Sequence, residues 1–107
     1  MGRLGEAIAA SFLERQGLAV VDRNVRIGRG EIDLIADQDG RRVAIEVKTV
    51  VGGGIDPPLP EDAFTDHKAR TVRDLANALE PGAARVDLIA ISLIETGARI
   101  RWLRSVC

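Results

Sequence analysis

Apolar residues recur at two different spacings along the chain, and the change of spacing separates helices from strands. Near the start Leu4, Ile8 and Phe12 fall four residues apart, which predicts an amphipathic helix over residues 4–16. Residues 18–23 are rich in β-branched side chains and predict a strand. The remaining pattern predicts a basic turn over 24–30, a hairpin over 31–49, a flexible loop over 51–62, a helix between Thr65 and Pro81, and strands over 85–92 and 99–103. The order α-β-β-β-α-β-β indicates an α/β fold, a central mixed five-stranded sheet flanked by helices.

The predicted hairpin gathers charge on one of its faces. Its turn is Asp39-Gly40, a pair that suits the positive φ angles of a type I′ connection. Closing the strands around this turn places Asp33 opposite Glu46 and Glu31 opposite Lys48. The alternate face is apolar and pairs Ile32 with Val47, Leu34 with Ile45 and Ala36 with Val43.

The facing carboxylates of Asp33 and Glu46 require an explanation, because like charges directly opposed destabilise a sheet. A bound cation would reverse that penalty, since carboxylate oxygens are ligands for hard ions such as Mg²⁺. Alternatively the face is simply solvated, and Glu31 with Lys48 forms a surface ion pair that contributes about 0–1 kcal/mol. The hairpin by itself leaves both interpretations open.

Composition narrows the class of protein. A chain of 107 residues, 46% hydrophobic and 29% charged, is expected to form a single domain over residues 1–107 with its own core. The aromatic residues are Phe12, Phe64 and Trp102, so the core is expected to be aliphatic and stacking on unpaired bases is disfavoured. The net charge of −1 is a mild argument against a DNA-binding protein, although carboxylates committed to a metal would conceal a basic rim.

The chain carries no signal of membrane insertion or oxidative folding. Its apolar runs are too short for a signal sequence or a membrane span, and the single cysteine cannot form an internal disulfide. These features predict a cytoplasmic protein that does not associate with membranes.

Written as a motif, the hairpin reads Gly-Glu-Ile-Asp-Leu-Ile over residues 30–35 and Ile-Glu-Val-Lys-Thr over residues 45–49. This resembles the acid-x(n)-Glu-x-Lys signature of the restriction-endonuclease-like nucleases, the PD-(D/E)XK superfamily. The closer resemblance is to the YraN family, bacterial proteins similar to archaeal Holliday-junction resolvases. It extends over nearly the whole chain and includes Gly5-Glu6, Ala9, Asn24, Arg26, Lys68 and Arg85-Val86-Asp87.

The resemblance implies a restriction-endonuclease-like fold and a metal-dependent endonuclease that hydrolyses DNA phosphodiesters, on branched or structured DNA in repair or recombination. It implies a homodimer, because resolvases cut two strands. Asp33, Glu46 and Lys48 would be catalytic. Mg²⁺ or Mn²⁺ would be held by Asp33, Glu46, the Val47 backbone carbonyl and Glu6, whose alternative role is that of a helix N-terminal acid worth about 0.3–1 kcal/mol.

The role of Lys48 can be argued from its surroundings. Beside carboxylates and without metal, its pKa should exceed the reference value of about 10.4, which makes it a poor base near neutrality. We therefore expect Lys48 to orient water and offset developing negative charge once a metal is bound.

Substrate contacts are assigned to Glu31, Arg26, Lys68 and Arg70. Lys68 falls in the first turn of the second helix, where a bound phosphate is favoured. Glu31 would orient Lys48 as an ion pair or approach a second ion. His67 is expected to be an exposed helix residue, because no second histidine or cysteine lies at metal-ligand spacing.

Val50 departs from the family pattern, which usually has arginine at this position. Its presence keeps an alternative open, a nuclease-like fold that binds nucleic acid or protein without cutting. Arg26, Arg29 or Arg70 could replace the missing cation. A third class, a purely structural α/β module, leaves the juxtaposition of Asp33 and Glu46 unexplained.

Overall fold

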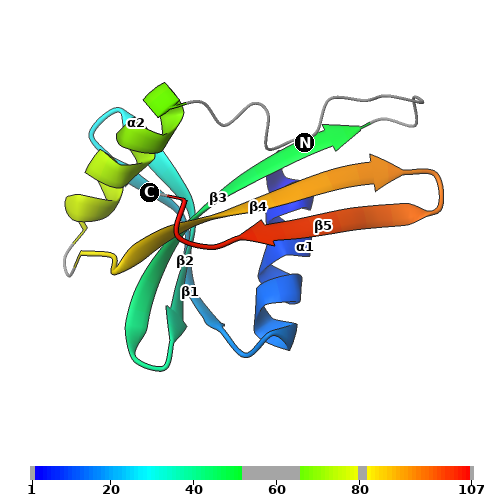
Figure 1. Ribbon diagram of the computed structural model, residues 1–107, viewed down its shortest axis with the longest axis horizontal. Helices are drawn as coiled ribbons and strands as arrows, with labels where there is room; N and C mark the ends of the chain where they lie inside the picture. The colour runs from blue at the N-terminus through cyan, green and yellow to red at the C-terminus, as the bar shows by residue number, and fades with distance from the viewer. Residues whose placement is uncertain (1, 52–65, 80–81, 107) are drawn as a thin grey trace.

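The computed structural model describes residues 2–51, 66–79 and 82–106, which form one mixed sheet and two helices (Figure 1). In chain order the elements are α1 (Gly2–Arg15), β1 (Ala19–Ile27), β2 (Gly30–Gln38), β3 (Arg41–Val51), α2 (Asp66–Asn77), β4 (Arg85–Ile94) and β5 (Gly97–Leu103). The strands lie in the order β1-β2-β3-β4-β5, with β3 and β4 parallel and the other neighbours antiparallel. The predicted α/β class, the element order and the restriction-endonuclease-like arrangement are therefore confirmed.

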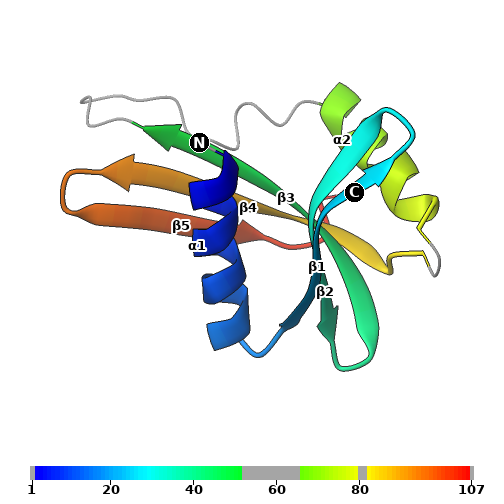
Figure 2. The same cartoon turned by 180° about the vertical axis from the view of Figure 1, so that it is seen from behind.

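The two helices cover opposite faces of the sheet at different places. Figure 2 shows α1 in front of the sheet, whereas α2 lies at the end where β4 begins. Each helix closes its own aliphatic core, as the composition predicts. The core under α1 contains Ala9, Ala10, Leu13, Leu18, Leu34, Ala36, Val43, Ile45, Ile89 and Ile91. The core under α2 contains Ile32, Ile35, Ala44, Val72, Ala76, Ala83 and Val86.

Helix α1 buries a different stripe from the one its large apolar residues predict. Leu4 is 54% exposed, whereas Ala9 and Leu13 are completely buried. Gly5 is also buried, and a Cβ added there would meet the Oγ1 atom of Thr49 on β3. The helix therefore packs on the sheet through small residues, which bring its backbone closer to β3 than a leucine stripe would allow.

Strand β1 is longer than predicted, because residues 24–27 continue the strand instead of beginning a turn. Arg26 pairs with Glu31 in the β1–β2 ladder, and the turn is reduced to residues 28 and 29. Asn24 has a φ of 52°, a conformation that asparagine tolerates better than most residues. The glycines and arginines of residues 24–30 favour a turn. Pairing with β2 nevertheless extends the strand to Ile27.

The β2–β3 hairpin confirms the predicted turn and register over its closed half. Asp39 and Gly40 have φ angles of 51° and 81°, the sign that a type I′ turn requires at both central positions. The ladder runs from Gln38 opposite Arg41 to Leu34 opposite Ile45. Beyond Leu34 and Ile45 the predicted pairing is wrong, because the two strands separate.

Beyond this hairpin, β3 continues to Val51, which the sequence places in the flexible loop. Residues 52–62 of that loop, and Thr65 as the cap of the second helix, lie outside the described residues. No helix among the described residues is long and apolar enough to cross a membrane.

The carboxylate of Asp87 joins β4 to the chain that follows β5. Asp87 is fully buried and accepts hydrogen bonds from Arg85, from the Trp102 indole N–H at 2.9 Å and from the Ser105 backbone N–H at 2.9 Å. Arg85 extends the connection to the Gln38 side-chain oxygen at 2.7 Å. Trp102 also meets Phe12 of α1 edge to face, with ring centroids 6.0 Å apart. Both aromatic residues are half-buried and pack against the core under α1.

Candidate metal centre

The candidate site forms where β2 and β3 separate. In a continued antiparallel ladder the Val47 N–H would be directed at the carbonyl of Ile32. It is donated instead to the Asp33 carboxylate, with Val47 N and Asp33 Oδ2 2.8 Å apart. Beyond this point β3 pairs with β4 alone. The side chain of Asp33 thus occupies the gap in which the sheet would otherwise close.

The separation divides the apolar face that the sequence predicts. Ile32 is buried under α2, whereas Leu34 is buried under α1 and Val47 packs against the α1 core. The predicted pairing of Ile32 with Val47 is therefore wrong. Backbone pairing of Asp33 with Glu46, and of Glu31 with Lys48, is wrong for the same reason.

The carboxyl groups of Asp33 and Glu46 nevertheless lie together in the structure. The pKa of Asp33 is raised from its ordinary value of 3.8 to about 6, chiefly by burial and next by the charge of Glu46. A hydrogen bond between the two side chains adds to this effect, whereas the Val47 N–H and the Lys48 ammonium lower the pKa. The two side chains therefore meet, as the sequence predicts. They do so without backbone pairing, because the ladder ends at Leu34 and Ile45.

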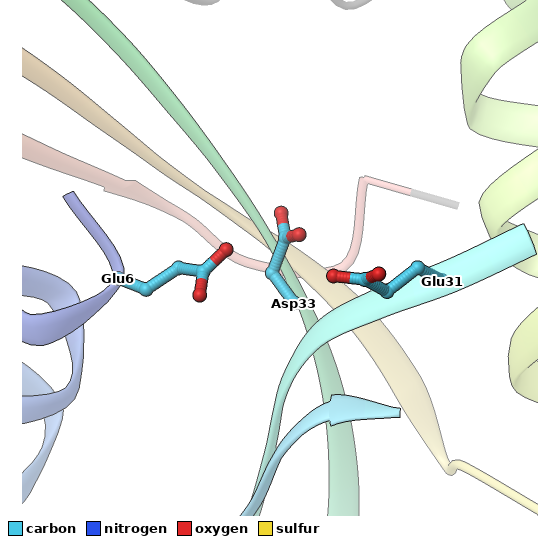
Figure 3. A group of neighbouring side chains, drawn as sticks. All are labelled: Glu6, Glu31 and Asp33. Atoms are coloured by element: carbon cyan, nitrogen blue, oxygen red, sulfur yellow. The ribbon is translucent and has the colours of Figure 1, made fainter. Parts of the chain in front are cut away.

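Glu6 reaches the same place from α1. Figure 3 shows Asp33 between Glu6 and Glu31, whose carboxylates are directed toward it from either side. One carboxylate oxygen from each of these residues lies within 4.8 Å of the others. The close approach of Gly5 to Thr49 positions the helix for this contact. Glu6 of α1 therefore lies beside Asp33 and Glu31 of β2, where the resemblance places it.

The surroundings of Glu6 are mainly acidic. Burial raises its pKa, and the charges of Asp33 and Glu31 raise it further, whereas a hydrogen bond from the Asn24 side chain lowers it. The resemblance includes Asn24 among its matching residues but assigns it no place in the site. Asn24 lies in β1, where the sequence predicts a turn, and its φ is positive. This local conformation accompanies the contact between Asn24 and Glu6.

Basic residues surround the four carboxylates of Glu6, Glu31, Asp33 and Glu46, which we call the acidic cluster. The Nζ atom of Lys48 lies 3.3 Å from Glu46 Oε1. The Nε atom of Arg26 lies 3.8 Å from Glu31 Oε2, but the Arg26 side chain is 85% exposed. Lys48 is therefore the better shielded of these two cations, and Glu31 has Arg26 as an ion-pair partner in place of the predicted ladder position opposite Lys48.

The donor atoms of the acidic cluster fit a hard divalent cation. Oxygens of Glu6, Glu31 and Asp33 converge within 4.8 Å, Glu46 meets Asp33 from β3 without joining that group of three, and Mg²⁺ and Mn²⁺ prefer oxygen ligands. The Val47 carbonyl is a further oxygen on this side, because the N–H and C=O of one strand residue point in the same direction. The ligand set implied by the resemblance is thus compatible with the geometry, with Glu31 as an additional neighbour.

The predicted substrate residues are more scattered. Arg26 borders the acidic cluster through Glu31. Arg29 lies exposed in the β1–β2 turn, and Arg70 lies exposed on α2. The side chains of Lys68 and His67 lie outside the described part of the chain, so their predicted roles stay predictions.

Comparison with known proteins places the chain in a family. The model of the uncharacterised protein family UPF0102 matches residues 5–91. The chain belongs to the UPF0102 family. This is the YraN family of the sequence resemblance, which is thereby confirmed.

Relatives in the UPF0102 family match over most of their length. A UPF0102 protein of Streptomyces coelicolor is 40% identical over 94% of this chain and 82% of its own length. A UPF0102 protein of Clavibacter michiganensis is 37% identical over all of this chain and 95% of its own length. One from Pelobacter propionicus is 41% identical over 92% of this chain and 74% of its own length. Their names state no activity, so the reaction has to be argued from the site.

Proposed function

We propose that this UPF0102 protein is a metal-dependent endonuclease that hydrolyses DNA phosphodiesters, with Mg²⁺ or Mn²⁺ held by the acidic cluster. The observation that supports this most is the convergence of Glu6, Glu31 and Asp33 from α1 and β2 at the point where β3 supplies Glu46 and Lys48. Carboxylates gathered in a partly buried place repel one another, and a divalent cation compensates that repulsion. The resemblance to nucleases adds an analogy at the level of the fold.

The residues divide into ligands and a positioning cation. Asp33 and Glu46 would hold the metal together with the Val47 carbonyl, and Glu6 would bind it directly or through water. When bound, the metal would polarise the phosphodiester and acidify water beside it. Lys48, 3.3 Å from Glu46, would orient the attacking water and balance the negative charge that develops on the phosphate.

The proposed substrate is branched or structured DNA, and the proposed assembly is a homodimer. Both follow from the similarity of this family to resolvases, which cut two strands. The scarcity of aromatic residues supports recognition through the DNA backbone, because bases have few rings on which to stack.

A second candidate function is binding of nucleic acid or protein without cleavage. Val50 supports it, because the strand position two residues after Lys48 carries an apolar side chain where the family usually has arginine. The net charge of −1 points in the same direction. This candidate shares the fold and the acidic cluster with the first and differs in the chemical step.

Titration calorimetry with Mg²⁺ and Mn²⁺, followed by incubation with four-way, flapped and linear DNA, tests the proposal. The wild type should bind metal and convert at least one DNA into products with 5′-phosphate and 3′-hydroxyl ends. Glu46→Ala should lose both properties, whereas Lys48→Ala should keep metal affinity and lose cleavage. Glu14→Ala, which changes an exposed acid elsewhere on α1, is the matched control and should behave as the wild type.

Each result separates the alternatives. Metal binding without cleavage of any DNA would favour the non-catalytic candidate. Absence of metal binding, or equal binding by Asp33→Ala, would exclude the metal site altogether. Loss of metal affinity in Lys48→Ala would contradict the positioning role given to that lysine.

A further inference from the structure

A row of basic residues crosses the sheet beside the acidic cluster. The ladders align Lys48 on β3 with Ala90 on β4 and Arg101 on β5. One step further from the cluster they align Val50 with Ser92 and Arg99. Residues paired across neighbouring strands point to the same side of a sheet. The side chains of Lys48, Arg101 and Arg99 therefore share one face.

The packing of β5 identifies this face as the one opposite α1. Ile100 and Trp102 pack against the core under α1. Because side chains alternate along a strand, Arg99 and Arg101 point to the other side. Both arginines are exposed. In Figure 1, α1 lies behind the sheet and α2 lies at the start of β4, so neither described helix covers the half of this face toward the β4–β5 turn.

The charges along these rows change sign with distance from the site. Glu46 stands in the row nearest the acidic cluster, and Lys48, Arg101 and Arg99 follow it. Lys48 and Arg101 are two strand spacings apart, roughly 10 Å. Between them lie Ala90, which is 1% exposed, and the half-buried Ser92, so the exposed positive charge of this face lies along β5. A backbone repelled by the acidic cluster would find its cationic contacts here.

We propose that Arg99 and Arg101 of β5, which are exposed on the face away from α1, bind the DNA backbone beside the acidic cluster. The assignment rests on the proposed nuclease function, because Lys48 belongs both to that site and to the basic row. The occupant is a duplex arm of DNA held by its phosphates. A single strand fits less well, because Trp102, the aromatic residue of β5, packs toward α1 on the opposite side.

Fluorescence anisotropy with a labelled four-way junction and a labelled duplex, in EDTA so that no cleavage occurs, tests the assignment. The Arg99→Ala/Arg101→Ala variant should bind on the order of tenfold more weakly than the wild type. Its plot of log affinity against log salt should be flatter by about two, one for each lost phosphate contact. Arg15→Ala/Arg41→Ala removes the same charge from exposed positions elsewhere and should bind as the wild type.

A charge-retaining variant and a folding check complete the test. Arg99→Lys/Arg101→Lys should recover most of the lost affinity, and thermal unfolding should show that all variants are folded. Equal binding by the β5 variant and the wild type would overturn the assignment, as would equal weakening in the Arg15/Arg41 control or an absence of DNA binding by the wild type. Cleavage by the wild type in Mg²⁺ is measured separately. The proposed reaction can therefore fail while the β5 contact with DNA holds, and the β5 contact can fail while cleavage is observed.

Discussion

Asp87 on β4 and Asp33 on β2 are both withdrawn from solvent in the sheet, yet their surroundings are opposite. Asp87 accepts five hydrogen bonds from Arg85, Trp102 and Ser105, and the Arg85 guanidinium balances its charge at 3.0 Å. Asp33 accepts one backbone N–H, and Glu46, Glu6 and Glu31 gather around it. The protein compensates the first carboxylate internally and leaves the second crowded by like charge.

The difference separates a structural acid from the proposed metal ligand. The partners of Asp87 join β4 to β5 and to the chain that follows, which stabilises the edge of the sheet. Burial and the charge of Glu46 raise the pKa of Asp33 to about 6, and acids perturbed in this way are frequent at functional sites. The local sequence does not distinguish the two aspartates, because each begins a copy of the tetrapeptide Asp-Leu-Ile-Ala.

The largest effect that this comparison predicts is the loss of stability in Asp87→Ala. Removing one partner of a buried ion pair leaves the Arg85 guanidinium uncompensated, so the free energy of unfolding should fall by about 3–5 kcal/mol. Urea unfolding at pH 7 in EDTA measures it, with Asp74→Ala on the exposed side of α2 as the control. A loss below 1 kcal/mol would show that Asp87 is not a structural acid.

In the metal-free protein, Asp33→Asn should raise the free energy of unfolding, which is the opposite of the effect of Asp87→Ala. Because the pKa of Asp33 is raised in the folded state from 3.8 to about 6, the folded protein holds a proton that the unfolded chain releases. The stability contributed by this group therefore falls as the pH rises from about 4 to about 6 and stays low above it. Above pH 7 Asp33→Asn should exceed the wild type by up to about 3 kcal/mol, and near pH 4 the two should coincide.

Urea unfolding of both proteins in EDTA at a series of pH values provides this comparison. Taking the difference between the two proteins removes the contribution of carboxylates that they share. A constant difference across the pH series would contradict the raised pKa of Asp33.

Metal should offset most of the stability by which Asp33→Asn exceeds the wild type. At a free Mg²⁺ concentration 100 times its dissociation constant, the wild type should gain about 2.7 kcal/mol at pH 7.5. The gain should shrink at pH 5, because Asp33 then holds a proton that the metal must displace. Thermal unfolding with and without Mg²⁺ measures this. An equal gain at both pH values, or in Asp33→Asn, would place the metal elsewhere.

Local pattern was sufficient to predict the closed half of the central hairpin. The Asp39-Gly40 turn and the alternation of apolar residues determine the register from Gln38 to Leu34, because both depend on neighbours in the sequence. The family motif then identified Asp33, Glu46 and Lys48 as a group. The structure brings Lys48 to Glu46 and Glu46 to Asp33, as that motif implies.

Contacts between distant segments account for what the pattern missed. The ladder ends at Leu34 because the Asp33 side chain takes a backbone donor from β3, which alternation does not reveal. The place of Asn24 beside Glu6 depends on how α1 packs against the sheet, and the hydrogen bond from Trp102 to Asp87 joins residues 15 positions apart. Such contacts become visible only when the sheet order is known.

The smallest predicted effect on stability concerns Gly5, where α1 approaches β3. An alanine Cβ at this position would meet Thr49 Oγ1, and such overpacking costs typically 1–3 kcal/mol, whereas alanine gains about 1 kcal/mol over glycine within a helix. Gly5→Ala should therefore lose about 1 kcal/mol net. Thr49→Ala removes the obstructing hydroxyl, so the double variant should be more stable than the sum of the single changes predicts.

Metal affinity sharpens this test, because Gly5 positions Glu6 without belonging to the acidic cluster. Displacing α1 should move Glu6 away from Asp33 and weaken Mg²⁺ binding in Gly5→Ala, and the double variant should recover it. The hydrogen bonds of Asp87 should change less than the acidic cluster, since their donors lie on β4, on β5 and in the chain after β5, and α1 meets one of them, Trp102, through Phe12. Calorimetry and urea unfolding on the four proteins of the cycle measure both quantities. Additive stabilities with unchanged metal affinity would show that the contact between Gly5 and Thr49 does not position the site.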